Sequence, residues 1–582
     1  MQTKELFFDI TCDEGLSCSL VGTSEKNGVT VYDFRLEWTD TAAEKNAGVK
    51  LEWYAPMLGF MYRWSPLCGT TRSISPNWCG RRTSMLAVNA PMETIHDGAG
   101  KNRYTFAVSE CAKRVSYGSG VVEENGGAHF MVQTNVKQYT SQNSASFSIY
   151  IDTRDIPMHE AVWGVADWWA VDCGMTPAEV PASALEPVYS FWYSYHQNLT
   201  DHDIEEECKR AKALGFNVCI VDDGWQTDDA SRGYAFCGEW QHAVSKMGDM
   251  AAHVARVHDI GMKYVLWYSV PFMGHNSSNY NDFKDMILYD NPELKAGILD
   301  PRYKEVREFL KNIYVKALNE WKLDGFKLDF IDQWNDSARN APYNEKMDIP
   351  AVQDAVDAFM TDVIASLKAV KPDIMLEFRQ CYIGPNMRKY GNMFRVGDCP
   401  NDYTKNRVGV LDLRMHLGDS AVHSDMLMWH TDELPELAAI QIIGVLFGVL
   451  QYSARLDKLT PEMEKMSRFW LDFMKKHSDL LLKARVVPYE PELLYTWAKS
   501  TLENECVIAV YSIDKCVKPD DVDTVYIANG CQSDRVLIEC DGNFAVCVQN
   551  CLGEIVCECE KQLNGANVIN VPVGGLITLK KA

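Results

Sequence analysis

The chain has 582 residues, of which 47% are hydrophobic and 11% are aromatic. It is too apolar to be mostly disordered and too long for one ordinary core, so we expect roughly two to four globular domains. Its net charge of −23 is spread without long blocks of one sign, which argues against binding to nucleic acid or to an anionic membrane surface.

The residues from Met1 to Asp9 lack the basic region and long apolar run of a signal peptide, and no other stretch is long and apolar enough to span a bilayer. The chain has nineteen cysteines, an odd number that cannot all pair within it. We therefore expect a reducing compartment, the cytoplasm. The densest cysteine group, residues 547 to 559, only loosely resembles a zinc ligand set, and we expect no metal there.

Up to about residue 180, short β-rich runs alternate with turn clusters. There are about six such runs, for example residues 28–32 and 145–151, and no convincing amphipathic helix lies among them. This pattern predicts an N-terminal β-sandwich domain over residues 1–180.

From residue 181 to 485, β-rich runs alternate with stretches of helical periodicity, which predicts an α/β fold. The helical segments are residues 200–214, 247–258, 304–321 and 351–369. The β-rich runs are residues 188–193, 217–222, 263–268, 325–330, 374–378, 393–397, 421–424 and, less clearly, 449–452. This count is typical of a (β/α)₈ barrel, a TIM barrel. The alternative is an open doubly wound sheet, but no glycine-rich phosphate loop follows the first run. Further β-rich runs predict a small C-terminal β domain over residues 486–582.

The fourth run of the predicted barrel carries a lysine and an aspartate. Side chains alternate along a strand, so Lys327 and Asp329 point to one side while the phenylalanines and the leucine around them pack on the other. A carboxylate beside a lysine stays ionised at neutral pH and can act as a nucleophile or general base. The pentapeptide alone is equally compatible with a structural salt bridge.

Polar and aromatic side chains follow several of the other runs. In a barrel the active site forms where the strands end, and two carboxylates with aromatic rings suit a sugar site. Each strand-end aspartate taken singly could instead be a turn or helix cap. The residues concerned are Trp192 and Tyr193 in the first run, Asp222 and Asp223 at the end of the second, Trp267 in the third, Arg379 after the fifth, Asp398 after the sixth, and His423 and Asp425 at the end of the seventh.

Several of these segments resemble glycoside hydrolase family 36, the α-galactosidases and their relatives. The segments are residues 190–198, residues 221–226 with the sequence Val-Asp-Asp-Gly-Trp-Gln, the approach to Trp267, and Lys327-Leu328-Asp329. Residues 185–430 carry the resemblance, and the flanking domains share only the architecture. Its most specific part is Asp-Asp-Gly-Trp followed about a hundred residues later by Lys-x-Asp.

The resemblance implies a retaining mechanism, in which Asp329 is the nucleophile and Asp398 the general acid/base. Asp402 is the competing candidate for the acid/base, and we prefer Asp398 because it lies at the predicted strand end. No metal or other cofactor is implied. The resemblance further implies that Asp222, Asp223, Lys327 and Arg379 bind sugar hydroxyls, and that Trp192, Tyr193, Trp267 and Trp64, the last reaching over from the N-terminal domain, form aromatic walls. The alternative for each tryptophan is ordinary core packing.

The sequence also departs from the family. The glutamate usual after the third strand is missing from residues 266–271, and the glycine-rich stretch usual after the fifth is replaced by Arg379-Gln380-Cys381-Tyr382. The residues before Asp398 also differ. These departures leave the identity of the α-linked sugar open.

We expect a retaining exo-α-glycosidase, foremost an α-galactosidase, that acts on small oligosaccharides. The alternatives are a transglycosylase like the raffinose-synthase relatives and a carbohydrate-binding protein without activity. The joint presence of Lys327, Asp329 and Asp398 argues against the last.

Overall fold

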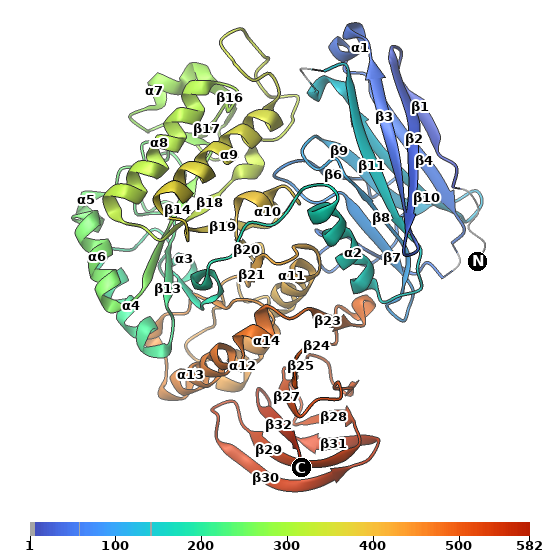
Figure 1. The fold of residues 1–582 in the computed structure, drawn as a ribbon. Coiled ribbons are helices and arrows are strands. Elements are labelled where there is room, and N and C mark those ends of the chain that lie inside the picture. Colours follow the sequence, from blue (N-terminus) through green and yellow to red (C-terminus); the bar gives the residue numbers. More distant parts are fainter. Residues whose placement is uncertain (1–5, 58, 140–141) are drawn as a thin grey trace.

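The computed structural model describes residues 6–57, 59–139 and 142–582. Three layered regions follow one another along the chain (Figure 1). A pair of β-sheets lies at the N-terminal end, a ring of parallel strands and helices lies beside it, and a second pair of β-sheets lies below.

The N-terminal region consists of two packed antiparallel sheets. One sheet has the order β1-β4-β10-β9-β6 and the other the order β2-β3-β11-β8-β7-β5. Inward-facing aromatic residues such as Phe34, Trp53 and Phe130 fill the space between the sheets. The strands are β1 Asp9–Cys12, β2 Leu16–Lys26, β3 Val29–Trp38, β4 Gly48–Ala55, β5 Tyr62–Trp64, β6 Arg82–Ser84, β7 Met92–His96, β8 Asn102–Val108, β9 Val115–Val121, β10 Ala128–Asn135 and β11 Ser144–Asp152. The predicted sandwich is confirmed, although its described residues form eleven strands rather than about six.

Helix α2 (Met158–Val171) lies in this region and was not predicted from the sequence. Val162, Val165 and Trp169 are buried, and the helix packs against β7, β8 and the barrel helix α11 (Tyr403–His416). Its hydrophobic residues surround most of its circumference because it is covered from two sides, by the sandwich and by the barrel. Its polar side, with the exposed Glu160 and Asp167, is narrow, so helical periodicity is hard to recognise in its sequence.

The middle region is the predicted barrel. Its eight parallel strands have the order β21-β20-β19-β18-β14-β13-β12-β22. Backbone hydrogen bonds from Val449 to Val422 and from Leu427 to Gln451 join the two ends of this order, so the sheet closes on itself. The strands are β12 Val188–Ser190, β13 Val218–Val221, β14 Lys263–Ser269, β18 Gly325–Asp329, β19 Met375–Arg379, β20 Met393–Arg395, β21 Ala421–His423 and β22 Gln451–Tyr452.

Helices connect these strands and cover the outside of the barrel. In α4 (Asp201–Leu214), Thr200 and Asp203 form a capping box, and Gly215 ends the helix in the left-handed conformation that glycine adopts without strain. The other long helices are α6 Met250–Ile260, α8 Lys304–Trp321, α9 Val352–Val370, α11, α12 Pro435–Gly444 and α13 Pro461–Lys476. Shorter ones are α3 Trp192–Tyr195, α5 Val244–Met247, α7 Tyr280–Phe283, α10 Met387–Tyr390 and α14 Ser478–Leu482. None of the helices in the described residues is long and apolar enough to cross a membrane.

The C-terminal region has a seven-stranded sheet, β23-β24-β25-β27-β32-β29-β30, packed on the three-stranded sheet β26-β28-β31. The strands are β23 Val486–Tyr489, β24 Trp497–Leu502, β25 Glu505–Val510, β26 Cys516–Val517, β27 Thr524–Asn529, β28 Arg535–Glu539, β29 Gly542–Gln549, β30 Ile555–Leu563, β31 Ala566–Asn570 and β32 Leu576–Lys581. The expected flanking β domains are therefore present, while the boundaries at residues 180 and 485 stay predictions.

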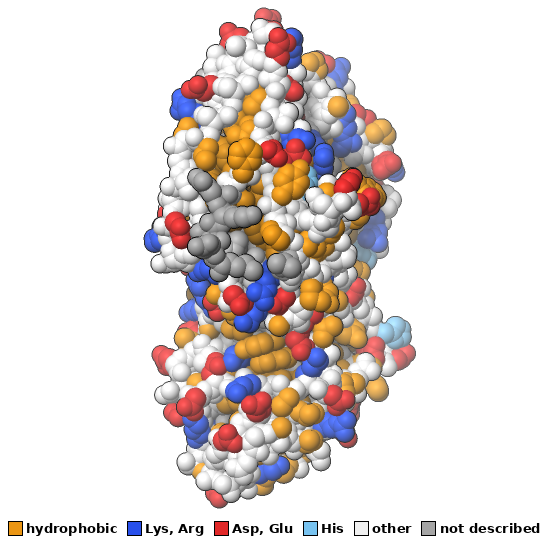
Figure 2. Space-filling model, turned by 90° about the vertical axis from the view of Figure 1, so that its right-hand side faces the viewer, with side chains coloured by type: hydrophobic (Ala, Val, Ile, Leu, Met, Phe, Trp, Pro, Cys, Tyr) orange, Lys and Arg blue, Asp and Glu red, His pale blue; other side chains and the backbone are white. Residues whose placement is uncertain are grey.

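The surface and the cysteines follow the composition. Figure 2 shows acidic and basic side chains interspersed over the described part of one face, with hydrophobic side chains between them. Cys557 and Cys559 lie on β30 and are exposed, whereas Cys551 is buried. No group of three or more His, Cys, Asp or Glu side chains among the described residues could hold a metal ion.

Candidate active site

The ends of the barrel strands bring most of the predicted site residues together. Lys327 and Asp329 both lie on β18, which pairs with β14 on one side and β19 on the other. This pairing places Trp267 opposite Lys327. Residues that are far apart in the sequence thus meet because neighbouring parallel strands end at the same edge.

Asp329 is the most heavily hydrogen-bonded carboxylate of this group. Its Oδ1 accepts from Arg379 Nε at 2.8 Å, from the backbone N–H of Phe330 at 2.8 Å and from the Tyr382 hydroxyl. Its Oδ2 accepts from Trp267 Nε1 at 3.1 Å. Burial raises the pKa of Asp329, but Arg379 and Lys327 more than offset this and hold the pKa well below its usual range. The carboxylate is therefore ionised and fixed in orientation.

A second group of acceptors lies directly after β13. Lys327 Nζ donates to Asp222 Oδ2 at 2.5 Å. Asp223 accepts from Gln197 Nε2 and from Gln226 Nε2, both at 2.6 Å. Burial, together with the neighbouring charge of Asp222, raises the pKa of Asp223 to about 7, although the two amide hydrogen bonds oppose the shift. This pair can accept hydrogen bonds from a polyhydroxylated ligand, and Asp223 changes charge near neutral pH.

Asp398 lies three residues beyond β20 and is held by Arg395. Arg395 Nη2 donates to Asp398 Oδ1 at 2.8 Å, and its Nη1 donates to Asp425. The Tyr193 hydroxyl donates to Asp425 Oδ2 at 2.9 Å. Burial raises the pKa of Asp398, but Arg395 and Lys327 outweigh burial and lower it. About half of the Asp398 side chain, 51%, remains exposed, so this carboxylate can reach a ligand.

Asp402, the competing candidate, has a different environment. It is the N-cap of α11, and its Oδ1 accepts from the backbone N–H of Lys405 at 2.9 Å. An aspartate that caps a helix satisfies an otherwise unpaired backbone donor, so its position is explained without a catalytic role.

Two of the predicted aromatic residues have environments that differ from that of Trp267. Trp192 is half-buried, with the Arg232 guanidinium 5.3 Å from its ring centre. Trp64 does reach out of the N-terminal domain, but it is fully buried and its Nε1 donates to Asp412 on α11 at 2.7 Å. The structure thus gives Trp64 the core-packing environment that was its alternative interpretation, and does not bring it to the catalytic cluster.

The structure also adds residues that the sequence did not single out for a role. Tyr382 donates to Asp329, and Gln226 holds Asp223 together with Gln197. Arg395 lies between Asp398 and Asp425. The only signal for Tyr382 was its place in the segment that departs from family 36, because periodicity does not show which side chain meets which across strands.

His423 has the environment of a structural histidine. It is fully buried, with Nε2 2.9 Å from the carbonyl oxygen of Ala184 and Nδ1 3.3 Å from Gln451 Nε2. Burial lowers its pKa to about 3, so it stays neutral at physiological pH.

Comparison with known proteins identifies relatives of this fold and sequence. The chain is 25% identical to α-galactosidase Mel36A of Lactobacillus acidophilus over 255 residues, which are 41% of this chain and 32% of that protein. It is 29% identical to the bifunctional α-galactosidase/sucrose kinase AgaSK of Mediterraneibacter gnavus over 147 residues, which are 24% of this chain and 15% of that protein. The matched segments thus span a third or less of the curated relatives' length.

Solved structures share the fold over almost the whole chain. A variant of the α-galactosidase AgaA from Geobacillus stearothermophilus, solved with raffinose, has a TM-score of 0.65 at 13% identity and is matched over 98% of this chain and 82% of that one. An α-galactosidase from Lactobacillus brevis has a TM-score of 0.64 at 12% identity, covering 99% and 86%.

The family model for melibiase matches residues 184–483, the region of the barrel and its helices. This match covers more than half of the chain and includes Asp222, Asp329 and Asp398. The protein therefore belongs to the melibiase family.

Proposed function

We propose that the protein is a retaining exo-α-glycosidase, an α-galactosidase, which hydrolyses terminal α-linked galactose-type sugars. The observation that carries this proposal is the environment of Asp329. It is an ionised carboxylate at the end of a barrel strand and is fixed by four donors. Lys327, on the same strand, interacts with Asp329 and donates to Asp222 of the acceptor pair. Membership in the melibiase family supports the same reaction.

In the first step Asp329 attacks the anomeric carbon. Among the described residues three donors hold Oδ1 and Trp267 alone holds Oδ2, so Oδ2 is the freer oxygen and makes the new bond. As the carbon–oxygen bond to the leaving group breaks, Asp398 gives its proton to that oxygen. The products are the free aglycone, a glycosyl ester on Asp329 and an ionised Asp398.

In the second step water attacks the anomeric carbon of the ester. Asp398 takes a proton from the water, and the carbon–oxygen bond to Asp329 breaks, which restores both carboxyl groups. Two inversions leave the sugar with its original configuration.

Asp398 must bind a proton before it can act as the acid. In the free protein Arg395 lowers its pKa, but half of its side chain is in contact with water. A bound sugar displaces that water, and desolvation raises the pKa of a carboxyl group. The role of Asp402 as the cap of α11 supports Asp398 as the acid/base.

We assign the recognition of sugar hydroxyls to Asp222, Asp223 and Lys327, with Arg379 fixing the nucleophile. Carboxylates accept from hydroxyl groups and the lysine donates to them. Relatives solved with raffinose and with stachyose support small α-galactosyl oligosaccharides as substrates. We place this activity in the cytoplasm, and the support for that location is the odd number of cysteines.

An assay of the purified chain with aryl α-galactosides, and with aryl α-glucosides and α-N-acetylgalactosaminides as alternatives, tests the proposal. We expect cleavage of the α-galactoside with release of α-galactose, and no turnover by Asp329→Ala. If the wild type cleaves none of these substrates, and so matches Asp329→Ala, the glycosidase proposal is wrong.

A further inference from the structure

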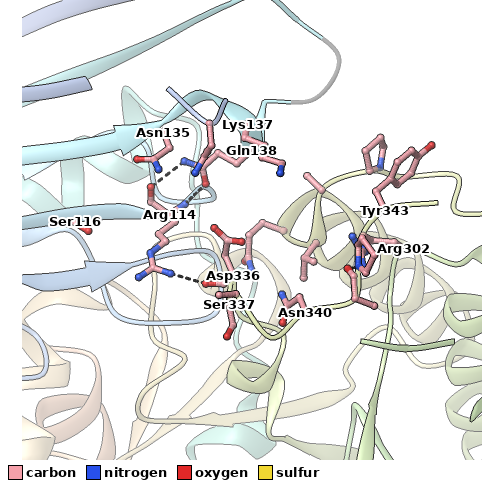
Figure 3. Close-up of a pocket in the computed structure, with 18 of the residues that line it drawn as sticks. Arg114, Ser116, Asn135, Lys137, Gln138, Arg302, Asp336, Ser337, Asn340 and Tyr343 are labelled. Carbon is pink, nitrogen blue, oxygen red and sulfur yellow. Dashed lines mark hydrogen bonds between the residues drawn. The ribbon is translucent and has the colours of Figure 1, made fainter. Parts of the chain in front are cut away.

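A polar cleft lies between the N-terminal sandwich and the barrel, apart from the catalytic cluster. Its volume is about 840 Å³. Figure 3 shows Arg114, Asn135 and Lys137 on the side of the sandwich, and Asp336 and Asn340 on the side of the barrel. Clefts between domains are common ligand sites, and this volume is within the usual range of about 300 to 1,000 Å³ for such sites.

The cleft lies toward the catalytic end of the barrel. The segment that follows the nucleophile strand lines it from Asp336 onward, seven residues beyond Asp329. Gln353, in the first turn of α9, and Arg302, just before α8, also line it. Helices that follow barrel strands begin at the carboxyl end of those strands, where active sites form.

Amide side chains dominate the polar lining. Two of their oxygens, Asn340 Oδ1 and Gln353 Oε1, are buried and have no hydrogen-bond partner within the part of the chain that the structure describes. These two oxygens are themselves covered by protein, so the amides that a ligand can reach most readily are the exposed Asn46 and the half-buried Gln133, Asn135 and Gln138. The amides are Asn46, Gln133, Asn135, Gln138, Asn340 and Gln353.

The cleft also carries positive charge in a chain that is strongly acidic overall. Arg302 is neutralised by Asp300, at 2.7 Å. Arg114 donates to the carbonyl oxygen of Asp336 at 2.6 Å, and neither it nor Lys137 pairs with a carboxylate in residues 6–57, 59–139 and 142–582. In addition, the N-cap of α9, Ala351, provides no side-chain acceptor for the first N–H groups of the helix. Among the described residues that line the cleft, Asp336 is the one acidic side chain near these cationic groups.

From these observations we propose that the interdomain cleft binds a segment of a carbohydrate chain that carries an anionic group, a carboxylate or a sulfate. Amides on both walls bind hydroxyl groups, and Arg114 and Lys137 bind the anion. The cleft holds sugars remote from the unit that is cleaved at Asp329. The inference rests on the proposed function for its sugar chemistry and extends it to larger, acidic glycans.

The dimensions and lining distinguish this ligand from a simple inorganic anion. A single phosphate would occupy only a small part of the cleft and would leave the amides of the opposite wall without a ligand. Pro342, Pro350 and Tyr343 add apolar surface, on which the faces of sugar rings pack.

Calorimetric titration of the full chain tests the proposal with probes that carry no α-galactosyl end. A hyaluronan tetrasaccharide supplies carboxylates, a κ-carrageenan tetrasaccharide supplies sulfates, and cellotetraose is neutral. We expect at least one acidic probe to bind, at least tenfold more tightly than cellotetraose. Arg114→Gln and Lys137→Gln should each weaken that binding about tenfold, because each removes one charge-assisted contact.

Lys368→Gln is the matched control. Lys368 also lacks a carboxylate partner in the described residues, but it lies in the last turn of α9, away from the cleft, and its replacement should leave the affinity unchanged. Binding of only one acidic probe assigns the anionic group to carboxylate or to sulfate. The proposal is overturned if neither acidic probe binds or if cellotetraose binds equally well. It is also overturned if Lys137→Gln binds like the wild type, since the Lys137 side chain makes no hydrogen bond or ion pair with the residues that the structure describes. Because no turnover is measured, these results are independent of the aryl α-galactoside assay.

Discussion

Two buried aspartates, Asp329 and Asp412, accept hydrogen bonds from the same three kinds of side chain. Asp329 accepts from Trp267, Arg379 and Tyr382. Asp412 accepts from Trp64 Nε1 at 2.7 Å, Arg72 Nη2 at 3.3 Å and the Tyr495 hydroxyl at 2.5 Å. The type of neighbour therefore does not by itself distinguish a catalytic carboxylate from a structural one.

Position and charge make the difference. All donors to Asp329 come from the barrel, and one of them is an arginine at 2.8 Å, whose charge helps to keep the pKa of Asp329 low. The donors to Asp412 come from the N-terminal and C-terminal regions, and burial raises its pKa despite Arg72. Arg72 is 4% exposed, whereas Arg379 is 22% exposed, at a site open to a ligand. We infer that Asp412 joins the three regions, and that Asp329 performs chemistry.

Replacing each aspartate by asparagine should separate the two roles most strongly. Asp329→Asn should lower kcat by about 10⁴-fold or more, since the attacking group is lost. Asp412→Asn should lower the free energy of unfolding by about 3 to 5 kcal/mol, because the buried Arg72 loses its counter-charge. Steady-state kinetics and urea unfolding of both variants check this. If Asp412→Asn is fully folded and yet as inactive as Asp329→Asn, the structural role assigned to Asp412 is wrong.

The role of Asp398 should depend on the leaving group. Asp398→Ala should lower kcat/KM for raffinose by about 10² to 10⁴-fold, because the sugar leaving group needs a proton. On a dinitrophenyl α-galactoside, whose leaving group needs little acid assistance, most of the activity should return. Asp402→Ala serves as the control and should lose stability through its cap without this dependence on the leaving group. An equal loss on both substrates for Asp398→Ala would refute the acid role.

Asp223 should determine the acid side of the pH profile. Its pKa of about 7 lies above the ordinary value, so it is protonated below pH 7 and loses acceptor capacity as the pH falls. The value of kcat/KM should therefore drop about tenfold per pH unit below pH 7, while Asp329 stays ionised. In Asp223→Asn, kcat/KM should be lower than in the wild type, and the drop in kcat/KM below pH 7 should disappear. If kcat/KM of the wild type instead begins to fall only near pH 4, the assignment to Asp223 is contradicted.

The two tryptophans offer the finest comparison. Trp267→Phe removes the donor to Asp329 Oδ2 and should lower kcat about tenfold. Trp64→Phe removes the donor to Asp412 and should cost about 2 kcal/mol of stability, with kcat and KM unchanged. A rise in KM for Trp64→Phe in a fully folded protein would instead indicate that Trp64 contacts the sugar.

Much of the fold could be predicted because it depends on local periodicity. The ends of β18 and α8 follow from alternation and from helical spacing, and their bounds agree with the predicted runs to within one residue. Short strands such as β5 and β6 were not predicted from the sequence, because three residues are too few to show alternation. Helix α2 was not predicted because two neighbouring regions cover it and leave only a narrow polar side.

The site was predictable where strand ends carry it and unpredictable where contacts cross strands. Asp222, Lys327 and Asp329 follow from position on the strands. The donation from Tyr382 to Asp329 depends on the path of the loop after β19, which no periodicity fixes. Trp64 was predicted at the sugar site but is not found there. Its side chain extends from the N-terminal region and donates to Asp412 instead.

The covalent intermediate is the most direct test of the central claim. An α-galactose-configured cyclophellitol epoxide should react with one carboxylate per chain, and mass spectrometry of the peptides should locate the adduct. We predict a single adduct on Asp329, formed with loss of activity and absent from Asp329→Ala. An adduct on another carboxylate, such as Asp222 or Asp398, or rapid turnover of α-galactosides without any adduct, would contradict the account.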